Sequence, residues 1–121
     1  MGRVVITGGT GFIGRSLARE LKAAGHEVAI LTRGEPGRAR QQDGMDLVGW
    51  DGVSGRGWSG YANGAWALVN LAGAGVADKR WSRARKALIR DSRVNAGQAV
   101  MDALSQVREL PRVLVQGSAV G

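Results

Sequence analysis

The fold of this chain is decided by residues 3–14, which read R-V-V-I-T-G-G-T-G-F-I-G. Residues 4–6 form a β-branched run, which is typical of a strand buried on both faces. Gly8, Gly11 and Gly14 follow, and after them apolar residues recur at helical intervals. Glycines permit a tight turn and a close approach to a pyrophosphate, while the free N–H groups that open a helix attract the anion. The stretch therefore predicts a dinucleotide-binding strand, turn and helix; the alternative is the same unit without a ligand.

Length and composition indicate one folded domain over residues 1–121, because 44% of the residues are hydrophobic and the chain is long enough for one core. With no signal peptide and no apolar run of membrane-spanning length, we expect a cytoplasmic protein that does not bind membranes. The absence of cysteine excludes disulfides and thiolate metal ligands, and we expect no metal site.

The net charge of +7 would suit nucleic acid, but the arginines are scattered and only 5% of residues are aromatic, so nucleic-acid binding is not favoured.

Segments typical of strands and of helices alternate along the rest of the chain. We expect further strands at residues 27–32, 46–50, 65–72 and 113–116, helices at residues 12–24 and 82–107, and one helical turn near Tyr61. The long helix is expected to carry Val100 and Met101 on its apolar face. Residues 34–44 are polar and rich in turn-forming residues, which predicts a mobile loop.

This alternation predicts an α/β fold of the Rossmann type, a doubly wound parallel sheet covered by helices on both faces. With the expected strands numbered along the chain, their order in the sheet should be 3-2-1-4-5. A ligand would then cross the carboxyl edge of the sheet between strands 1 and 4, where the order reverses.

The end of the second expected strand bears on the choice of cofactor. NAD-preferring proteins place a carboxylate there, where it accepts from the ribose hydroxyls. This chain has Thr32 and Arg33 at that position, and no carboxylate before Glu35. An arginine can pair with a 2′-phosphate in a forked, charge-assisted contact that a carboxylate would oppose. The sequence therefore predicts NADP(H), with NAD(H) the less favoured cofactor; the alternative is an arginine that is merely solvated.

Further motifs resemble one family of proteins. Residues 49–51 (G-W-D), 70–75 (N-L-A-G-A-G), 79–81 (K-R-W), 91–94 (D-S-R-V) and 118–121 (S-A-V-G) occur in this order. Together with the glycine turn they resemble the bacterial epimerase-family group of atypical, extended short-chain dehydrogenases/reductases, within the NAD(P)-dependent epimerase/dehydratase family. Members of that family are much longer, so the chain resembles an N-terminal portion and the fold is expected to be truncated.

The resemblance implies a role for several individual positions. The pyrophosphate would be held by Gly8, Gly11, Phe12, Ile13 and Gly14, and Thr10 would also bind the cofactor. Other parts of the cofactor would be contacted by Thr32, Arg33, Asp51, Leu71, Ala72, Gly73 and Arg93. Asp51 would face adenine; the alternative is that it only caps the following turn. Arg93 is alternatively part of a solvated helix face, and Asn70 is interpreted as a tie between neighbouring strands.

The activity implied by the resemblance is that of an NADP(H)-dependent oxidoreductase or epimerase. A hydride would pass to or from a small carbonyl or sugar-nucleotide substrate, with Ser118 as the catalytic serine that orients the reacting oxygen; alternatively, Ser118 is an ordinary strand-end serine. The superfamily uses a tyrosine with a lysine four residues later, whereas the only tyrosine here is Tyr61 and position 65 is Ala65. This chain alone is therefore expected to be inactive, and the alternative function is non-catalytic dinucleotide binding or redox sensing.

A truncated sheet also predicts self-association. The face beside the fourth and fifth expected strands would expose apolar surface, because the elements that follow in the family are missing. We therefore expect the chain to form a homo-oligomer through that face; the alternative is that it is part of a longer chain.

Overall fold

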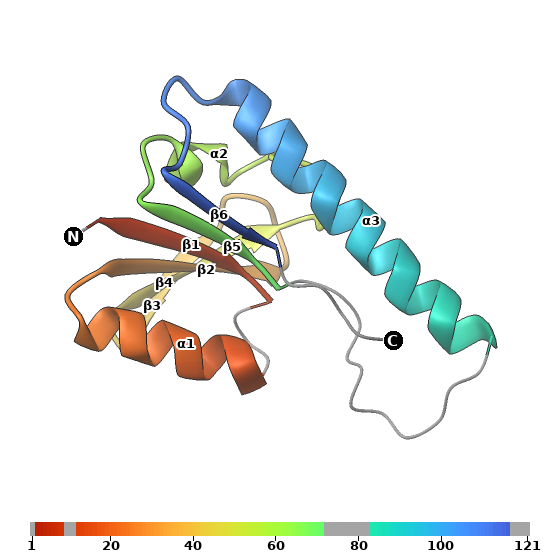
Figure 1. Cartoon of the computed structure of the whole chain (residues 1–121), viewed down its shortest axis with the longest axis horizontal. Coiled ribbons are helices and arrows are strands. Elements are labelled where there is room, and N and C mark those ends of the chain that lie inside the picture. The colour runs from red at the N-terminus through yellow and green to blue at the C-terminus, as the bar shows by residue number, and fades with distance from the viewer. Residues whose placement is uncertain (1, 9–11, 72–82, 117–121) are drawn as a thin grey trace.

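The computed structural model describes residues 2–8, 12–71 and 83–116 (Figure 1). In this part of the chain a six-stranded sheet has the strand order β3-β4-β2-β1-β5-β6. The strands are β1 (Arg3–Thr7), β2 (Glu27–Arg33), β3 (Ala39–Gln42), β4 (Met45–Trp50), β5 (Ala67–Asn70) and β6 (Val113–Gln116). The helices are α1 (Phe12–Ala23), α2 (Ser59–Ala62) and α3 (Arg83–Gln106).

The doubly wound topology predicted from the sequence is confirmed. Each pairing along β4-β2-β1-β5-β6 is parallel. These are the five strands that the sequence predicts, and when they are numbered 1 to 5 along the chain their order is the expected 3-2-1-4-5. β1 lies between β2 and β5, and its last residue, Thr7, is in register with Leu31 on one side and Asn70 on the other. The order reverses between β1 and β5, so the carboxyl edge there is the place where this class of fold binds ligands.

The prediction of a mobile loop over residues 34–44 is wrong. Residues 39–42 form β3, which pairs antiparallel with β4 at the edge of the sheet. The two strands are joined by Asp43 and Gly44, which have φ values of 53° and 76°. Positive φ at both positions suits a two-residue hairpin turn, and Asp-Gly is a favoured sequence for it. The sheet is therefore mixed, with one antiparallel edge strand.

The two faces of the sheet bury alternate residues of the central strands. Val4 and Ile6 of β1 pack in the cluster that includes Ala18 of α1, whereas Val5 packs with Ala99 of α3. Figure 1 shows α1 on one side of the sheet, with α2 and α3 on the other. Because both faces are covered, the central strands are apolar throughout, as the sequence predicts.

The long helix α3 follows the prediction except on one face. Ser82, where the sequence predicts this helix to begin, lies outside the described residues. Val100 is 1% exposed, but Met101 is 66% exposed, so the expectation that both are on the apolar face is wrong. Met101 points about 100° further around the helix than Val100, which turns it away from the sheet and into solvent. Among the described residues no helix is both long and apolar enough to cross a bilayer.

Strand β6 carries the exposed apolar surface that the sequence predicts. Val113, Leu114 and Val115 are 41%, 47% and 44% exposed. In the described part of the chain, β6 is the last strand of the sheet and pairs only with β5. An apolar edge strand is a template for further strand pairing.

Candidate functional site at the carboxyl edge of the sheet

Four neighbouring strands bring the predicted cofactor-binding positions to one edge of the sheet. Gly8, Asp51 and Leu71 directly follow β1, β4 and β5, and Arg33 is the last residue of β2. Arg33 is in register with Trp50, and the Leu71 amide donates a 3.0 Å hydrogen bond to the Thr7 carbonyl. Because these strands are parallel and end within a residue or two of one another, the four positions lie along the same edge.

The glycine turn begins as the sequence predicts. Gly8 has a φ of 74°, a left-handed backbone conformation that favours glycine. The helix that should face the pyrophosphate, α1, starts at Phe12, so Phe12, Ile13 and Gly14 lie in its first turn. Gly14 is buried. Thr10 and Gly11 lie outside the described residues. The contact of this turn with a pyrophosphate stays a prediction.

A buried side-chain hydrogen bond fixes β5 beside β1 at this edge. The Thr7 hydroxyl donates to Asn70 Oδ1 at 2.5 Å, and the two residues are 0% and 7% exposed. The interpretation of Asn70 as a tie between neighbouring strands is confirmed. Its partner Thr7 is a part of the site that sequence reasoning missed, because the two residues are 63 positions apart.

Arg33 is the last residue of β2, and its backbone is held by the neighbouring strand β4. It pairs with Trp50 in the register of β2 and β4, and the next amide, that of Gly34, donates to the Trp50 carbonyl at 3.2 Å. Arg33 itself is exposed, whereas Thr32 is half-buried. A guanidinium on a fixed backbone at the ligand edge is suited to binding an anion.

Asp51 caps the turn that follows β4, as one of the two interpretations of the sequence predicts. Its Oδ1 accepts hydrogen bonds from the amides of Val53 at 2.9 Å and Ser54 at 2.8 Å, and its Oδ2 accepts from the Ser54 hydroxyl at 2.6 Å. The Ser54 hydroxyl, and then the Val53 amide, hold the pKa of Asp51 below its ordinary value. Contact of Asp51 with adenine stays a prediction.

The pKa of Asp51 leads to a pH-dependent prediction. Since this pKa is lower in the folded chain than in the unfolded chain, the stabilisation is present above the unfolded-state pKa and is lost as pH falls through the folded-state pKa. Asp51→Ala should lower the free energy of unfolding by about 1 kcal/mol at pH 7, the usual cost of removing a capping side chain. Denaturant titrations should show this difference shrinking toward acidic pH, whereas Asp51→Asn, which keeps an oxygen acceptor, should lose less. A difference that is constant with pH would contradict the assignment.

Ala72, Gly73 and Ser118 lie outside the described part of the chain. Arg93 belongs to α3, and its contact with a phosphate stays a prediction. Among the described residues no group of three or more His, Asp or Glu side chains is placed to hold a metal ion.

Tyr61 lies away from this edge. It is in α2, and the Arg3 guanidinium carbon is 5.7 Å from the centre of its ring. Arg3 opens β1, whereas Gly8 follows the end of the same strand. Tyr61 is therefore near the amino edge of the sheet, so it does not replace the tyrosine of the superfamily's catalytic pair.

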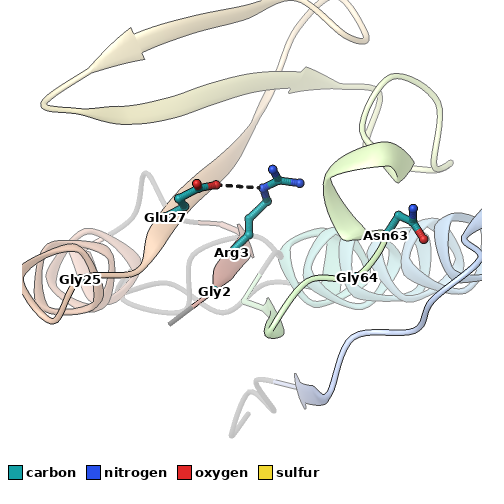
Figure 2. Close-up of a pocket in the computed structure, with 6 residues that line it drawn as sticks. All are labelled: Gly2, Arg3, Gly25, Glu27, Asn63 and Gly64. Carbon is teal, nitrogen blue, oxygen red and sulfur yellow. Dashed lines mark ion pairs between the residues drawn. The ribbon is translucent and has the colours of Figure 1, made fainter.

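A hollow of about 350 Å³ also lies at the amino edge (Figure 2). It is lined by Gly2, Arg3, Gly25, Glu27, Asn63 and Gly64. Figure 2 shows the ion pair between Arg3 Nε and Glu27 Oε2, which are 3.4 Å apart, beside this hollow. Both side chains are partly or largely exposed, so the hollow is an open, polar surface feature at the opposite end of the strands from Gly8 and Arg33.

Comparison with known proteins agrees with this topology. The model of the NAD dependent epimerase/dehydratase family matches residues 4–120. Epimerase family protein YfhF of Bacillus subtilis is 36% identical over 120 residues, covering 98% of this chain and 38% of the relative. Epimerase family protein SDR39U1 of Bos taurus is 35% identical, covering 97% of this chain and 37% of the relative.

A solved structure gives the same result. The crystal structure of human epimerase family protein SDR39U1 (isoform 2) with NADPH has a TM-score of 0.72 and 30% sequence identity, covering 98% of this chain and 37% of that one. The chain thus spans about 38% of the length of the curated relatives it matches. Since the family model matches nearly the whole sequence, the chain belongs to the NAD dependent epimerase/dehydratase family.

Proposed function

We propose that this chain binds NADP(H) as the cofactor-binding part of a short-chain dehydrogenase-type oxidoreductase or epimerase. The observation that carries the proposal is that the same ligand edge has Gly8, at a φ of 74°, and Arg33, which forms no ion pair with any described residue. Glycine at a positive φ fits the close approach of a pyrophosphate. The guanidinium supplies the charge that a 2′-phosphate needs.

The residues at the edge fit the chemical groups of this cofactor. The turn at Gly8 and the start of α1 would hold the pyrophosphate, and Thr32 and Arg33 would hold the ribose and its 2′-phosphate. The family is NAD-dependent by description, and the human relative crystallised with NADPH is 30% identical to this chain. Both facts support a nicotinamide dinucleotide, and the arginine favours its phosphorylated form.

For the whole protein we propose hydride transfer to or from a small carbonyl or sugar-nucleotide substrate. The bound cofactor would supply or accept the hydride. Ser118 would orient the reacting oxygen of the substrate, as the family resemblance implies. This chain has no tyrosine–lysine pair to serve as general acid and base, so we propose that it binds the cofactor but does not turn over by itself.

Calorimetric titration with NADPH and NADH tests the proposal. NADPH should bind, and NADH should bind at least about tenfold more weakly, because it lacks the phosphate contact with Arg33. Release of no heat with either nucleotide would overturn the proposed function. Equal affinities would overturn the preference for NADP(H) and leave the dinucleotide site in place.

The placement of Tyr61 favours a second candidate, a dinucleotide-binding or redox-sensing protein without catalysis. Tyr61 packs near Arg3 at the amino edge, and Ala65 stands where the lysine of the pair would be. Oxidation of NADPH by a panel of carbonyl compounds, monitored at the nicotinamide absorbance, separates the two candidates. Cofactor binding with no turnover by the full-length protein would favour the sensor.

We also propose that the 121-residue chain self-associates through the edge of β6. A second copy offers an identical strand, and two such edges can pair antiparallel about a twofold axis while covering Val113, Leu114 and Val115. Sedimentation should therefore show a mass that rises with concentration. Leu114→Lys should weaken the association, because a lysine on an edge strand opposes pairing. A monodisperse monomer at high concentration would contradict this prediction.

A further inference from the structure

We propose that Gly52 is a positioning residue that holds the Arg33 guanidinium where it can bind the 2′-phosphate of NADP(H). The inference rests on the proposed function and adds a residue that selects between the two nicotinamide cofactors. Gly52 would not touch the cofactor; it would act through Arg33.

The side chain of Arg33 lies in the space that a side chain on Gly52 would fill. A Cβ atom built on Gly52 would lie 2.5 Å from Arg33 Nε, 2.7 Å from Cζ and 3.0 Å from Nη2. Gly52 also has a φ of 82°, which disfavours other residues. The guanidinium is thus laid directly against the Gly52 backbone, and any side chain there would displace it.

The backbone on both sides of this contact is fixed. Arg33 is tied to Trp50 by the pairing of β2 with β4, and the carboxylate of Asp51 holds the turn that contains Gly52. The guanidinium therefore rests on a surface that does not move freely relative to its own strand. Ordering an arginine before its ligand arrives lowers the entropic cost of binding.

The charge of Arg33 is available to a ligand. Among the described residues no carboxylate forms an ion pair with it. Asp51, the acidic residue that holds this turn, has both oxygens engaged with Val53 and Ser54. Gly52 thus supports a cation that the turn itself does not neutralise, and a phosphate dianion is the anion that differs between the two cofactors.

Gly52→Ala tests the inference, with Gly44→Ala as a matched control. Gly44 has a similar φ of 76°, and its added Cβ would also meet the far end of a flexible cationic side chain, Lys22, with Cε at 2.5 Å. Gly44 lies in the β3–β4 turn, at the end of β4 opposite to Gly52. The two variants therefore impose comparable backbone strain and comparable displacement of a cation, but only one of them displaces Arg33.

Titration with NADPH and NADH should separate positioning from a general structural role. Gly52→Ala should weaken NADPH about tenfold and change NADH by less than about twofold, since one charged contact is lost. Gly44→Ala should change neither. In an Arg33→Met background, Gly52→Ala should have no further effect on NADPH, because the residue through which it acts is absent.

The outcomes also distinguish this inference from the proposed function. NADPH selectivity that depends on Arg33 but survives Gly52→Ala would overturn the inference alone. Binding of neither nucleotide to the unmodified chain would overturn the proposed function and the inference with it. If Gly52→Ala does not fold, Gly52→Asn places a Cβ at the same point on the residue type that best tolerates left-handed backbone, and the same selectivity loss is required of it.

Discussion

Replacing Arg33 by aspartate is expected to reverse the cofactor preference. The change removes the cation beside the 2′-phosphate and puts a carboxylate at the strand end, where it repels the phosphate and can accept from the ribose hydroxyls of NAD(H). Loss of one charge-assisted contact alone is worth about tenfold to 100-fold in affinity. With repulsion added, NADPH should bind at least about 100-fold more weakly, while NADH should bind as well as before or better.

The measurement is a pair of titrations on the variant, and its control is Arg40→Asp. Arg40 is exposed in the middle of β3, opposite Leu47. Its replacement therefore makes the same change in net charge, but away from the carboxyl edge where the cofactor would bind. Any effect of overall charge on a polyanionic ligand appears in both variants. An unchanged ratio of NADPH to NADH affinity in Arg33→Asp would show that the guanidinium does not select the cofactor.

The parts of this fold that follow from sequence are those specified by local pattern. Buried parallel strands are unbroken apolar runs, and the order of strands follows from the alternation with helices. β3 has neither signal, because residues 39–42 read A-R-Q-Q and all four are exposed. In the sequence only the dipeptide Asp43-Gly44 indicates a hairpin. Because it stands within a polar stretch with no alternating apolar residues beside it, it does not by itself predict a strand.

The site divides in a similar way. Gly8 and Arg33 are predictable because their role comes from standing at the end of a strand. The proposed role of Gly52 is not predictable, since it depends on the Arg33 side chain of β2, which reaches the turn after β4 only when β2 and β4 are paired. The same holds for Thr7, whose partner Asn70 is brought near by the parallel pairing of β1 and β5. Contacts between distant segments leave no periodicity in a single sequence.

A second large effect is expected from Gly49→Ala, which should strongly destabilise the chain. Gly49 is buried in β4, and a Cβ on it would lie 2.1 Å from the Glu35 carbonyl oxygen and 2.9 Å from the Glu35 carbonyl carbon. These are backbone atoms, so they cannot turn aside as a flexible side chain does. The segment after β2 must move as a whole, and that motion breaks its hydrogen bonds to β4.

Two of those hydrogen bonds join the segment directly to Gly49. The Gly37 amide donates to the Gly49 carbonyl at 3.0 Å, and the Gly49 amide donates to the Arg38 carbonyl at 2.8 Å. Overpacking of a closely packed site costs about 1–3 kcal/mol, and each lost hydrogen bond costs about 1 kcal/mol. We therefore expect Gly49→Ala to lower the free energy of unfolding by about 3 kcal/mol or more in denaturant titrations.

The matched control is Gly60→Ala, another glycine-to-alanine change in a regular element. Gly60 is exposed in α2, and an added Cβ there meets no atom within 4 Å. Alanine is the better helix former, so this variant should be as stable as the parent or slightly more stable. If Gly49→Ala matched it to within about 0.5 kcal/mol, the segment after β2 would be free to move. The close packing of residues 35–38 against β4 would then contribute little to stability.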